Sequence, residues 1–366
     1  MPMSSVFYAL PMKKVVILSA FLSPFRSGAE ACAEEVSARL GDRFDITIIT
    51  AKLRRDLPRN DRLREKVPVI RIGLGHPIDK WLFPFLAPFA ARKLHPDIIH
   101  AVLESFAGLA LFFCRLIARG PKRMLTLQTT NRNFLRGPII RWPHRVTAIS
   151  IALQKQAAEY GRTDVAVIPN GIPYAAVRSA CDRVGKVEGR MLFVGRLEYM
   201  KGVDVLLQAC ATLHSPLSAL HIVGTGSREA ELKNICDRLQ LTDRVRFLGH
   251  LSGPDLLREY AEAEIFCGLS RSEALGNVFL EAQAAGCCVV GTRVGGIPEI
   301  IRDGETGILV PPENPAAAAG ALAKLLSDRV LRAHLVSNAV IHAEAYDWDI
   351  IADRYASTYD SLAHRL

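Results

Sequence analysis

The sequence predicts an α/β protein with two consecutive, doubly wound, Rossmann-like domains. Short apolar, β-branched segments alternate with segments of helical periodicity along most of the 366 residues, which is the pattern of strand–helix–strand units. The pattern restarts near the middle of the chain, and the length suits two domains. The charge divides there too. Residues 1–170 carry 26 Lys/Arg and 13 Asp/Glu, a charge of +13, whereas residues 171–366 carry 20 and 24, a charge of −4.

The first predicted domain covers residues 1–170. A buried strand at 15–20 is followed by a loop at 21–27 and by a helix over 29–40, in which apolar residues recur at helical spacing. Other short apolar segments predict strands at 45–50, 69–72, 97–102, 124–128, 146–150 and 165–169. Because helical stretches separate several of them, a parallel sheet is expected.

Residues 171–189 have weak periodicity and three glycines, so we interpret them as an interdomain linker. The second predicted domain covers residues 190–345. Its strands are expected at 190–194, 220–223, 245–248, 264–269, 288–291 and 308–310, and its helices at 203–213, 228–239, 255–263 and 278–285. Residues 346–366 end the chain, and from about 348 they predict one amphipathic helix that packs as a terminal strap.

Several classes of protein are excluded. The best apolar run, residues 105–114, ends at Arg115 and is far shorter than the roughly 20 residues of a membrane-spanning helix. Residues 1–11 lack the charged start and long apolar stretch of a secretory signal. The eight cysteines include no CxxC pair and match no zinc pattern. We therefore expect reduced thiols in a cytoplasmic protein.

Five loops of the second domain are rich in glycine or charge, and each follows a predicted strand. Parallel sheets bind ligands beyond the carboxyl ends of their strands. The loops are therefore expected on one rim, which would face the first domain across a cleft. They lie at 195–201, 224–226, 249–252, 270–277 and 295–299.

The first of these loops places two cations, Arg196 and Lys201, five residues apart. A diphosphate needs neutralising charge and donors, which a guanidinium and an ammonium supply in different geometries. Surface charges on a solvated loop are the alternative. A later loop, with the sequence GTGS at 224–227, begins like a dinucleotide fingerprint but has Glu229 where the third glycine would stand, which argues against NAD.

The stretch from Ser270 to Ala282 is the most informative. Glu273 precedes a predicted helix start at 276–277, and Glu281 lies one to two turns inside that helix. The amides at a helix N-terminus favour a phosphate oxygen, and carboxylates can accept hydrogen bonds from the hydroxyls of sugar rings. A helix with two unremarkable glutamates is the alternative.

Together these segments resemble the nucleotide-sugar domain of retaining glycosyltransferases of family 4, which have the two-domain GT-B architecture. The resemblance rests on GRLEYMKG (195–202), VGTGSREAEL (223–232), RFLGHLS (246–252), SEALGNVFLEAQAAG (272–286) and VVGTRVGGIPEIIRDGETGILVPPENP (289–315). The first half is similar more weakly, through SGAE (27–30), PDIIH (96–100) and VIPNG (167–171). Residues 346–359 resemble the family's C-terminal crossover helix.

The resemblance implies specific roles on the donor side. Arg196 and Lys201 would neutralise the diphosphate, and Glu273 would hold a hydroxyl of the transferred sugar; we take these three as catalytic. Glu281 would hold the ribose, and the loop near Leu251 would contact the base. The remaining expected donor-binding residues are Gly276, Asn277, Val278, Gly195, Gly224 and Gly226.

The resemblance also implies sites in the first domain. Ser27 and Gly28 belong to the glycine loop that approaches the donor phosphate and the acceptor, and Gln128 and His100 are expected on the acceptor side. The family often has His where this chain has Gln128, and Gln cannot act as a general base. Front-face displacement with retention does not need one there, because the leaving phosphate oxygen takes the acceptor proton. A second departure, Cys288 in place of the usual proline, is expected to change only the entry to a strand.

The implied reaction is transfer of a sugar from a nucleoside diphosphate sugar to a glycan or lipid-linked glycan, in polysaccharide or glycolipid assembly. UDP is favoured as the nucleotide and GDP is the second choice; neither a metal nor a cofactor is expected. A non-catalytic homologue that binds sugar or membrane is the alternative, and a nucleotide-dependent oxidoreductase is a weaker one. Intact Arg196, Lys201, Glu273 and Glu281 argue against the non-catalytic alternative.

The basic first domain predicts a further partner. Seven lysines and arginines crowd residues 52–66, and residues 79–94 mix four Trp and Phe residues with flanking cations. That composition suits peripheral docking on the anionic inner face of the cytoplasmic membrane. A core-facing segment is the alternative, and Pro84 and Pro88 argue against one continuous helix. No nucleic-acid-binding motif accompanies the basic residues, so no nucleic acid is expected.

Overall fold

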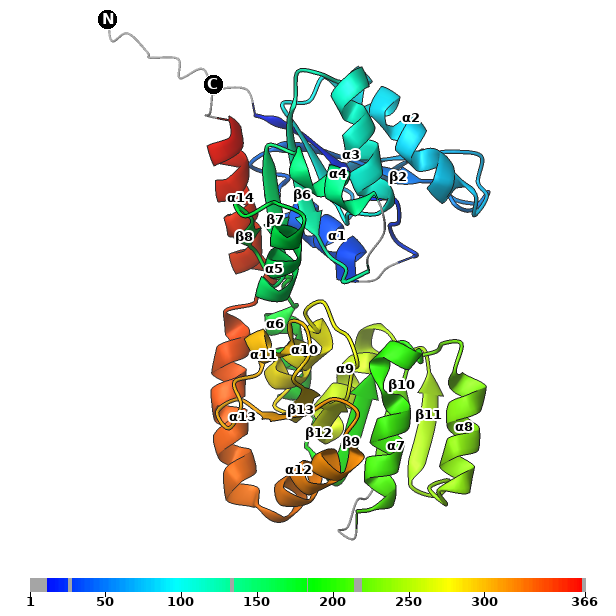
Figure 1. The fold of residues 1–366 in the computed structure, drawn as a ribbon, viewed down its shortest axis with the longest axis vertical. Helices are drawn as coiled ribbons and strands as arrows, with labels where there is room; N and C mark the ends of the chain where they lie inside the picture. Colours follow the sequence, from blue (N-terminus) through cyan, green and yellow to red (C-terminus); the bar gives the residue numbers. More distant parts are fainter. Residues whose placement is uncertain (1–11, 26–27, 132–134, 183, 214–218, 364–366) are drawn as a thin grey trace, which may run out of the picture. The chain divides into compact units, whose positions relative to one another are not determined.

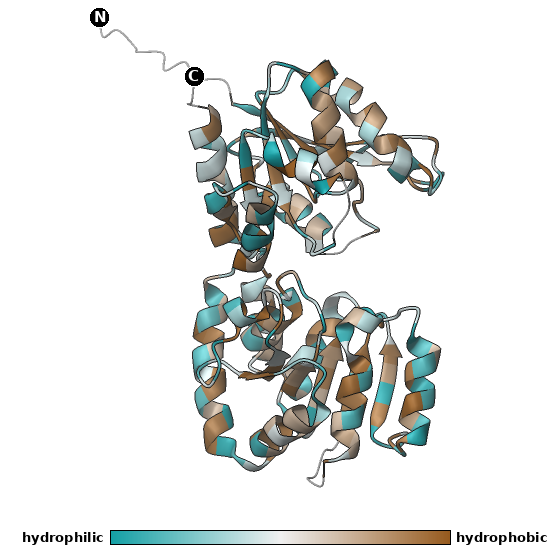
Figure 2. Cartoon of the chain, in the orientation of Figure 1, coloured by the Kyte–Doolittle hydropathy of each residue, from teal (hydrophilic) through white to brown (hydrophobic). Residues whose placement is uncertain are grey.

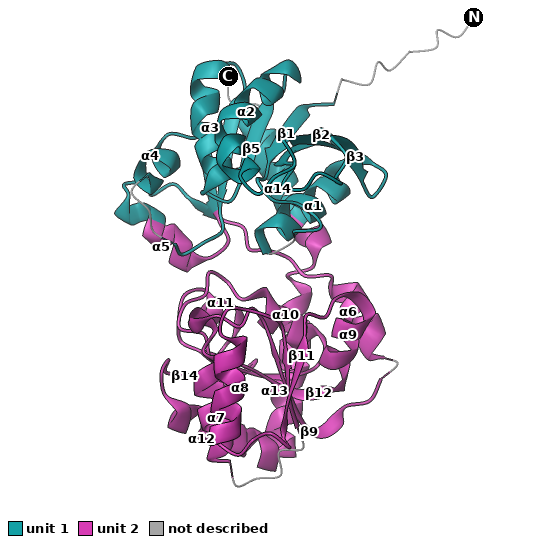
Figure 3. Cartoon of the chain, turned by 90° about the vertical axis from the view of Figure 1, so that its right-hand side faces the viewer, with its two compact units in different colours: residues 1–147, 157–166, 352–366 teal, residues 148–156, 167–351 magenta. Residues whose placement is uncertain are grey.

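The computed structural model describes residues 12–25, 28–131, 135–182, 184–213 and 219–363. It divides the chain into two compact units (Figure 3). Unit 1 comprises residues 1–147, 157–166 and 352–366, and unit 2 comprises residues 148–156 and 167–351. In each unit a largely parallel sheet is covered by helices on both faces (Figure 1), so the predicted fold class is confirmed.

The sheet of unit 1 has eight strands in the order β3-β4-β2-β1-β5-β6-β7-β8. Their bounds are Lys14–Leu18 (β1), Asp45–Ala51 (β2), Asn60–Leu63 (β3), Val67–Ile72 (β4), Ile98–Val102 (β5), Lys122–Leu127 (β6), Arg145–Ala148 (β7) and Ala166–Val167 (β8). At the centre, Val16 pairs in parallel with Thr47 on one side and with Ile99 on the other. All five residues of β5 are buried, because helices cover both faces of a parallel sheet.

The helices described beside this sheet are α1 (Gly28–Leu40), α2 (Asp79–Lys93), α3 (Phe106–Ile117), α4 (Arg136–Arg141) and α14 (Trp348–Ala363), whereas α5 (Ile151–Glu159) belongs to unit 2 up to residue 156 and to unit 1 from residue 157. α14 begins in unit 2, and from Ala352 onward the chain belongs to unit 1. Tyr355 and Tyr359 of α14 are fully buried. The end of the chain therefore supplies part of the core of the unit in which the chain begins.

α2 differs from the prediction, because it is one helix with Pro84 and Pro88 inside it. Phe83, Ala87 and Ala91 recur every four residues and are fully buried, so one face of the helix packs in the interior of the unit. This burial offsets the two backbone hydrogen bonds that the prolines cannot donate. Tertiary packing, which a local pattern does not contain, overrides the low helix propensity of proline.

The segment at 52–66, which carries seven cations, is not a simple loop. β3 and β4 form an antiparallel hairpin there, and several of the cations are paired with acids. Arg54 pairs with Asp56, Arg64 with Glu35 at 2.6 Å, and Lys66 with Asp42 at 3.4 Å. Part of the positive charge of the first domain is therefore balanced within unit 1.

The sheet of unit 2 has six strands in the order β11-β10-β9-β12-β13-β14. Their bounds are Val187–Val194 (β9), Ala219–Val223 (β10), Val245–Gly249 (β11), Ala263–Gly268 (β12), Cys288–Thr292 (β13) and Ile308–Val310 (β14). Leu192 of the central strand β9 pairs in parallel with His221 and with Phe266. In both units hydrophobic residues gather on the strands and on the helix faces next to them (Figure 2).

The helices described in unit 2 are α6 (Tyr174–Cys181), the 3-10 turn η1 (Tyr199–Lys201), α7 (Val203–Ala211), α8 (Glu229–Arg238), α9 (Gly253–Glu262), α10 (Asn277–Ala284), α11 (Ile297–Ile300), α12 (Pro315–Ser327) and α13 (Arg329–Glu344). α6 lies inside the segment that we interpreted as a linker. Its Val177 is buried, and Arg178 donates to the carbonyl of Ala284 at 3.0 Å. Residues 174–181 are therefore part of unit 2.

Candidate functional site

The five glycine-rich loops of unit 2 are joined by backbone hydrogen bonds at the carboxyl ends of its strands. Gly195 donates to Val223 and Gly224 to Gly249, at 3.0 and 2.7 Å. Other bonds run from Arg271 to Met200 at 2.8 Å and from Gly296 to Glu273 at 3.2 Å. The loops after β9, β10, β11, β12 and β13 thus form one continuous rim.

Glycine is required where these loops touch. Gly224 has φ +133°, and a Cβ there would lie 1.9 Å from the carbonyl oxygen of Gly195. A Cβ on Gly295, with φ +53°, would lie 1.8 Å from the carbonyl oxygen of Glu273. No side chain fits at either distance, so both positions keep the loops close. Gly226 is equally confined, because its Cβ would meet the carbonyl of Leu197 at 2.4 Å.

Lys201 and Glu273 meet on this rim, where the Lys201 Nζ donates to Glu273 Oε2 at 2.5 Å. Their side chains are 20% and 14% exposed, so both remain open to a ligand. Ser270 Oγ lies 3.5 Å from the same carboxylate oxygen. The pair holds the lysine in place, and an incoming phosphate could compete with the carboxylate for the ammonium group. Arg196 is exposed and forms no ion pair within the described parts of the chain.

Glu281 lies in the second turn of α10 and has a fixed neighbour. Tyr260 of α9 donates its hydroxyl to Glu281 Oε2 at 2.9 Å. Burial, followed by the charge of Glu281, raises the pKa of Tyr260 well above its ordinary value, so this phenol remains a donor. This contact could not be predicted from the sequence, because Tyr260 has the pattern of any residue on the apolar face of a helix.

The start of α10 offers backbone donors beside the two glutamates. Gly276 has φ +98° and immediately precedes the helix, which has no side-chain cap. The amide of Phe279 already donates to the carbonyl of Gly276. The amides of Asn277 and Val278, which belong to the first turn, are suited to an anionic oxygen. The predicted donor residues 273–281 are therefore brought together within unit 2.

A second cluster beside η1 was not predicted. Arg271 donates two hydrogen bonds of 2.8 Å to the carboxylate of Asp204, and it also pairs with Glu313. These acids raise the pKa of Arg271. The guanidinium carbon of Arg271 lies 4.0 Å from the centroid of the Tyr199 ring, and that of Arg228 lies 5.4 Å from it. The cluster anchors the turn that presents Lys201.

Leu251 is half-buried in the loop between β11 and α9. That loop joins the rim through the hydrogen bond between Gly224 and Gly249.

Cys288 is the first residue of β13 and is 1% exposed. It pairs with Ile265 of β12 in regular register. The substitution of Cys for the family's proline therefore leaves strand entry regular.

In unit 1, Gly28 is the first residue of α1 and is exposed, whereas Ser27 lies outside the described residues. Gln128 follows β6 and is 7% exposed. Its backbone amide donates to Glu104 Oε2 at 2.8 Å, and Glu104 Oε1 pairs with Arg136 at 2.6 Å. Arg136 also donates to the carbonyl of Thr129 at 2.7 Å. This buried ion pair, which sequence patterns did not reveal, fixes the loop that carries Gln128.

His100 does not fit the acceptor-side role that we expected for it. It is 1% exposed, and its ring nitrogens lie 2.8 Å from the Tyr359 hydroxyl and 2.7 Å from Thr126 Oγ1. Burial lowers its pKa to about 3. Both nitrogens are used inside unit 1, so the structure makes His100 a core residue.

Two kinds of feature are absent from the described residues. No group of three or more His, Cys, Asp or Glu there is placed to hold a metal ion. Within the same residues, no helix is both long enough and apolar enough to cross a membrane.

Comparisons with known proteins agree with this geometry. A family model for glycosyl transferases group 1 matches residues 185–341, and the model for Glycosyltransferase Family 4 matches residues 26–175. The D-inositol 3-phosphate glycosyltransferase of Acidothermus cellulolyticus is 30% identical over 412 residues, which covers 96% of this chain and 91% of that protein. The phosphatidyl-myo-inositol mannosyltransferase of Mycobacterium leprae is 29% identical over 280 residues and covers 73% and 74%.

Solved structures support the fold. Sucrose-phosphate synthase from Thermosynechococcus elongatus has a TM-score of 0.82 at 21% identity, covering 96% of this chain and 99% of that one. The Anabaena protein HepE, in complex with UDP and glucose, has a TM-score of 0.78 at 22% identity and covers 95% and 100%. Sequence and structure therefore agree that this chain belongs to glycosyltransferase family 4 and is a glycosyltransferase with the GT-B fold.

Proposed function

We propose that this glycosyltransferase takes its sugar from a nucleoside diphosphate sugar, with UDP preferred over GDP, and transfers it with retention of configuration. One observation carries the proposal: Lys201, Glu273, the first turn of α10 and Glu281 share one rim of unit 2. They offer a cation, open amides and two carboxylates, which match a diphosphate, a sugar hydroxyl and a ribose. That HepE was solved with UDP and glucose favours the same donor class.

In the proposed reaction, the bond from the sugar's anomeric carbon to the donor phosphate oxygen breaks. A bond to the acceptor hydroxyl oxygen forms on the same face of the ring, and the hydroxyl proton passes to the leaving phosphate oxygen. Arg196, Lys201 and the α10 amides would stabilise the charge that develops on the leaving diphosphate. Glu273 would orient the sugar and Glu281 the ribose. No side chain is required as a general base, which is compatible with Gln128.

The proposed acceptor is a hydroxyl group of a glycan or lipid-linked glycan used in cell-surface polysaccharide or glycolipid assembly. The names of two relatives also point to inositol phosphates, free or lipid-borne, as acceptors for those proteins. An acceptor screen should therefore include both classes.

A thermal-shift screen of UDP, GDP, ADP and their sugars tests the donor. A ligand that binds only the folded protein at 100 times its Kd adds about 2.7 kcal/mol to stability, so UDP should raise Tm most. Slow hydrolysis of the matching UDP-sugar without acceptor should follow. A chain that responds to none of the nucleotides would contradict the proposal and favour a non-catalytic homologue.

We also propose that unit 1 docks on the anionic inner face of the cytoplasmic membrane. α2 supports this, because Trp81, Phe85 and Phe89 are 61%, 55% and 56% exposed. Large aromatic side chains next to cations favour a membrane interface. Binding to anionic vesicles that added salt weakens is the expected result. Equal binding to neutral vesicles, or none, would contradict this docking.

A further inference from the structure

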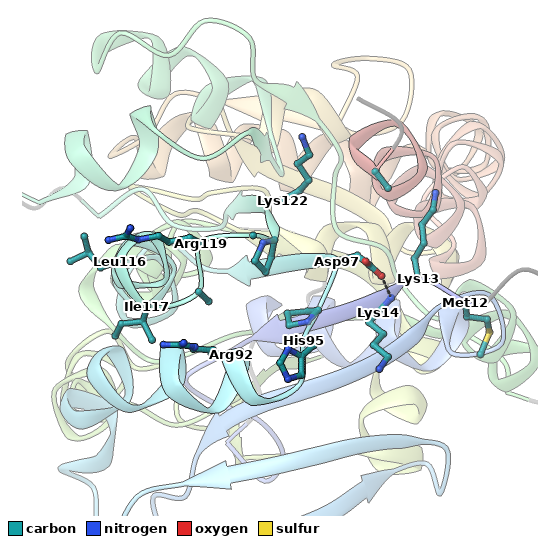
Figure 4. Close-up of a pocket in the computed structure, with 15 residues that line it drawn as sticks. Met12, Lys13, Lys14, Arg92, His95, Asp97, Leu116, Ile117, Arg119 and Lys122 are labelled. Atoms are coloured by element: carbon teal, nitrogen blue, oxygen red, sulfur yellow. Dashed lines mark hydrogen bonds between the residues drawn. The ribbon is translucent and has the colours of Figure 1, made fainter. Parts of the chain in front are cut away.

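A large basic pocket lies in unit 1, at the amino-terminal ends of the strands, whereas Gln128 lies at their carboxyl-terminal ends. Its volume is about 1280 Å³, and Figure 4 shows its lining. Lys14 and Lys122 are the first residues of β1 and β6, whereas Gln128 follows the end of β6. Because ligands of such sheets bind at the carboxyl ends of the strands, this pocket is separate from the substrate side.

Positive charge dominates the pocket. Among its described lining residues, Asp97 is the single acid, and its carboxylate accepts the backbone amide of Lys14 at 2.7 Å. The basic lining residues are Lys13, Lys14, Arg92, His95, Arg119 and Lys122. Arg92 and Arg119 lie on the same side of the pocket, around Ile117 (Figure 4). They are exposed and form no ion pair within the described residues.

Attraction to the C-terminal ends of helices does not by itself explain the positions of these cations. Arg92 lies in the last turn of α2, and Arg119 lies in the loop two residues after the end of α3, where a cation is favoured by the helix dipole. Lys14 and Lys122 instead begin strands, and strands have only small net dipoles. Two strands, one helix and the loop after α3 therefore place positive charge around one pocket, and this arrangement suits an anionic group.

An apolar strip on α2 leads to the pocket. Ile78 is 50% exposed, and with Trp81, Phe85 and Phe89 it repeats at spacings of three or four residues, so the four side chains lie along one face. Arg92 continues that spacing at the end of the helix. Leu116 of α3 is 63% exposed and lines the pocket itself. The apolar strip and the basic pocket are therefore continuous.

We infer that this pocket holds the anionic headgroups of membrane lipids while the strip on α2 enters the interface beside them. The inference rests on the proposed docking of unit 1 and names its contact site. An anionic leaflet attracts nearby lysines and arginines, and aromatic rings lie at the level of the headgroups. Single-stranded nucleic acid also binds cations and aromatic rings, but Ile78 and Leu116 offer no ring for stacking.

Two charge-matched double variants of the full-length protein test the inference. Arg92→Ala/Arg119→Ala removes two pocket cations. Arg59→Ala/Arg62→Ala removes two exposed cations from the β3–β4 hairpin. Binding is measured by co-sedimentation with phosphatidylcholine vesicles that contain 30% or no phosphatidylglycerol, at low and high salt. One cation near an anionic surface contributes about fivefold to affinity, so the pocket variant should bind about 25-fold more weakly. The cations at 52–66 also favour docking of unit 1 but lie outside the pocket, so the hairpin variant should lose clearly less affinity, no more than about fivefold.

The outcomes separate the two proposals. If wild type binds anionic vesicles and both variants lose affinity equally, the docking stands and the pocket assignment is wrong. If wild type binds neither type of vesicle, both are wrong. Retained binding by the pocket variant, tight binding to single-stranded RNA in place of vesicles, or an Arg92- and Arg119-dependent thermal shift with inorganic phosphate alone also overturns the inference. An unchanged far-UV spectrum and Tm in both variants confirms that they are folded.

Discussion

Lys201 and Glu273 are 72 residues apart in the chain, yet their side chains meet at 2.5 Å. Under the proposed function, the pairing would give each residue two tasks. The carboxylate holds the ammonium group on the rim; with a donor bound, the ammonium group would turn to phosphate and the carboxylate would accept a sugar hydroxyl. Lys201 and Glu273 are paired with each other in the structure. Both are nevertheless available for the proposed chemistry, because both side chains remain partly exposed.

Removing either the cation or the ribose partner should slow the reaction. Lys201→Ala and Glu281→Ala are each expected to lower the turnover of the nucleotide sugar by at least about tenfold, the scale of one lost charged contact. Lys233→Ala is the matched control, because Lys233 pairs with Glu229 on the exposed face of α8. Initial rates of nucleoside diphosphate release measure the effect. Near-normal rates in both site variants would show that the site is assigned wrongly.

His100 should make the stability of the protein depend on pH. Its pKa is about 3 in the folded protein and about 6.5 when unperturbed. Between these values the unfolded chain binds a proton that the folded chain does not, so the free energy of unfolding falls as the pH is lowered. One such group contributes a slope of up to about 1.4 kcal/mol per pH unit.

His100→Gln removes this titration, so the variant should lose less stability between pH 6.5 and pH 4.5 than wild type does. Urea unfolding at several pH values measures the difference in slope. The slope is the informative quantity, because the variant also changes the hydrogen bonds to Tyr359 and Thr126. Parallel curves for the two proteins would mean that His100 is already protonated, or that it is exposed.

At the scale of elements, the loops of unit 2 depend on contacts between backbones. Gly224→Ala places a Cβ where the carbonyl oxygen of Gly195 stands, and it does so at a φ that side chains avoid. We expect a loss of about 2–4 kcal/mol in the free energy of unfolding and weaker nucleotide binding. Gly320→Ala, in α12 with open space around it, should instead stabilise the helix by about 0.5–1 kcal/mol. Denaturant unfolding measures the free energy of unfolding of both variants, and thermal shift with UDP measures their nucleotide binding. Equal stability of the two variants would contradict the tight contact between the loops.

The elements that the sequence predicted well are those with a strong local pattern. Apart from β3, the strands of both sheets and the loops that follow them were placed within a few residues, because buried strands are short apolar runs bounded by turn residues. The prediction that α2 would not be one helix was wrong. Its two prolines are visible in the local sequence, whereas the packing of Phe83 and Ala87 depends on residues that are distant in the chain. The hairpin strand β3 was missed because its sequence, NDRL, is polar and exposed.

For the whole molecule, the return of the chain to unit 1 contributes buried side chains to the core of that unit. α14 places Tyr355, Tyr359 and Leu362 in the core of unit 1 with no more than 4% exposure. Losing two buried aromatic side chains costs about 3–5 kcal/mol each, against a total of about 5–15 kcal/mol for a domain. Unit 1 is therefore expected not to fold without the end of the chain.

A chain ending at Ile351 tests this expectation. Unit 1 should lose its cooperative unfolding transition, whereas unit 2, which ends at that residue, should keep its own. Calorimetry of the two proteins measures the transitions, and binding of a hydrophobic dye reports the exposed core. A shortened chain with both transitions intact would mean that α14 adds little to unit 1.

By itself, the sequence determined the two-domain α/β class, the positions of most strands along the chain and the rim residues from Arg196 to Glu281. These are set by local periodicity and by motifs whose members lie close in the chain. Only the tertiary structure decided that His100 belongs to the core, that Tyr260 binds Glu281, and that Glu104 and Arg136 fix the loop of Gln128. It also decided that cations from four separate segments of the chain share one pocket. Each of these depends on side chains distant in sequence, whose burial and charge take effect only when the fold brings them together.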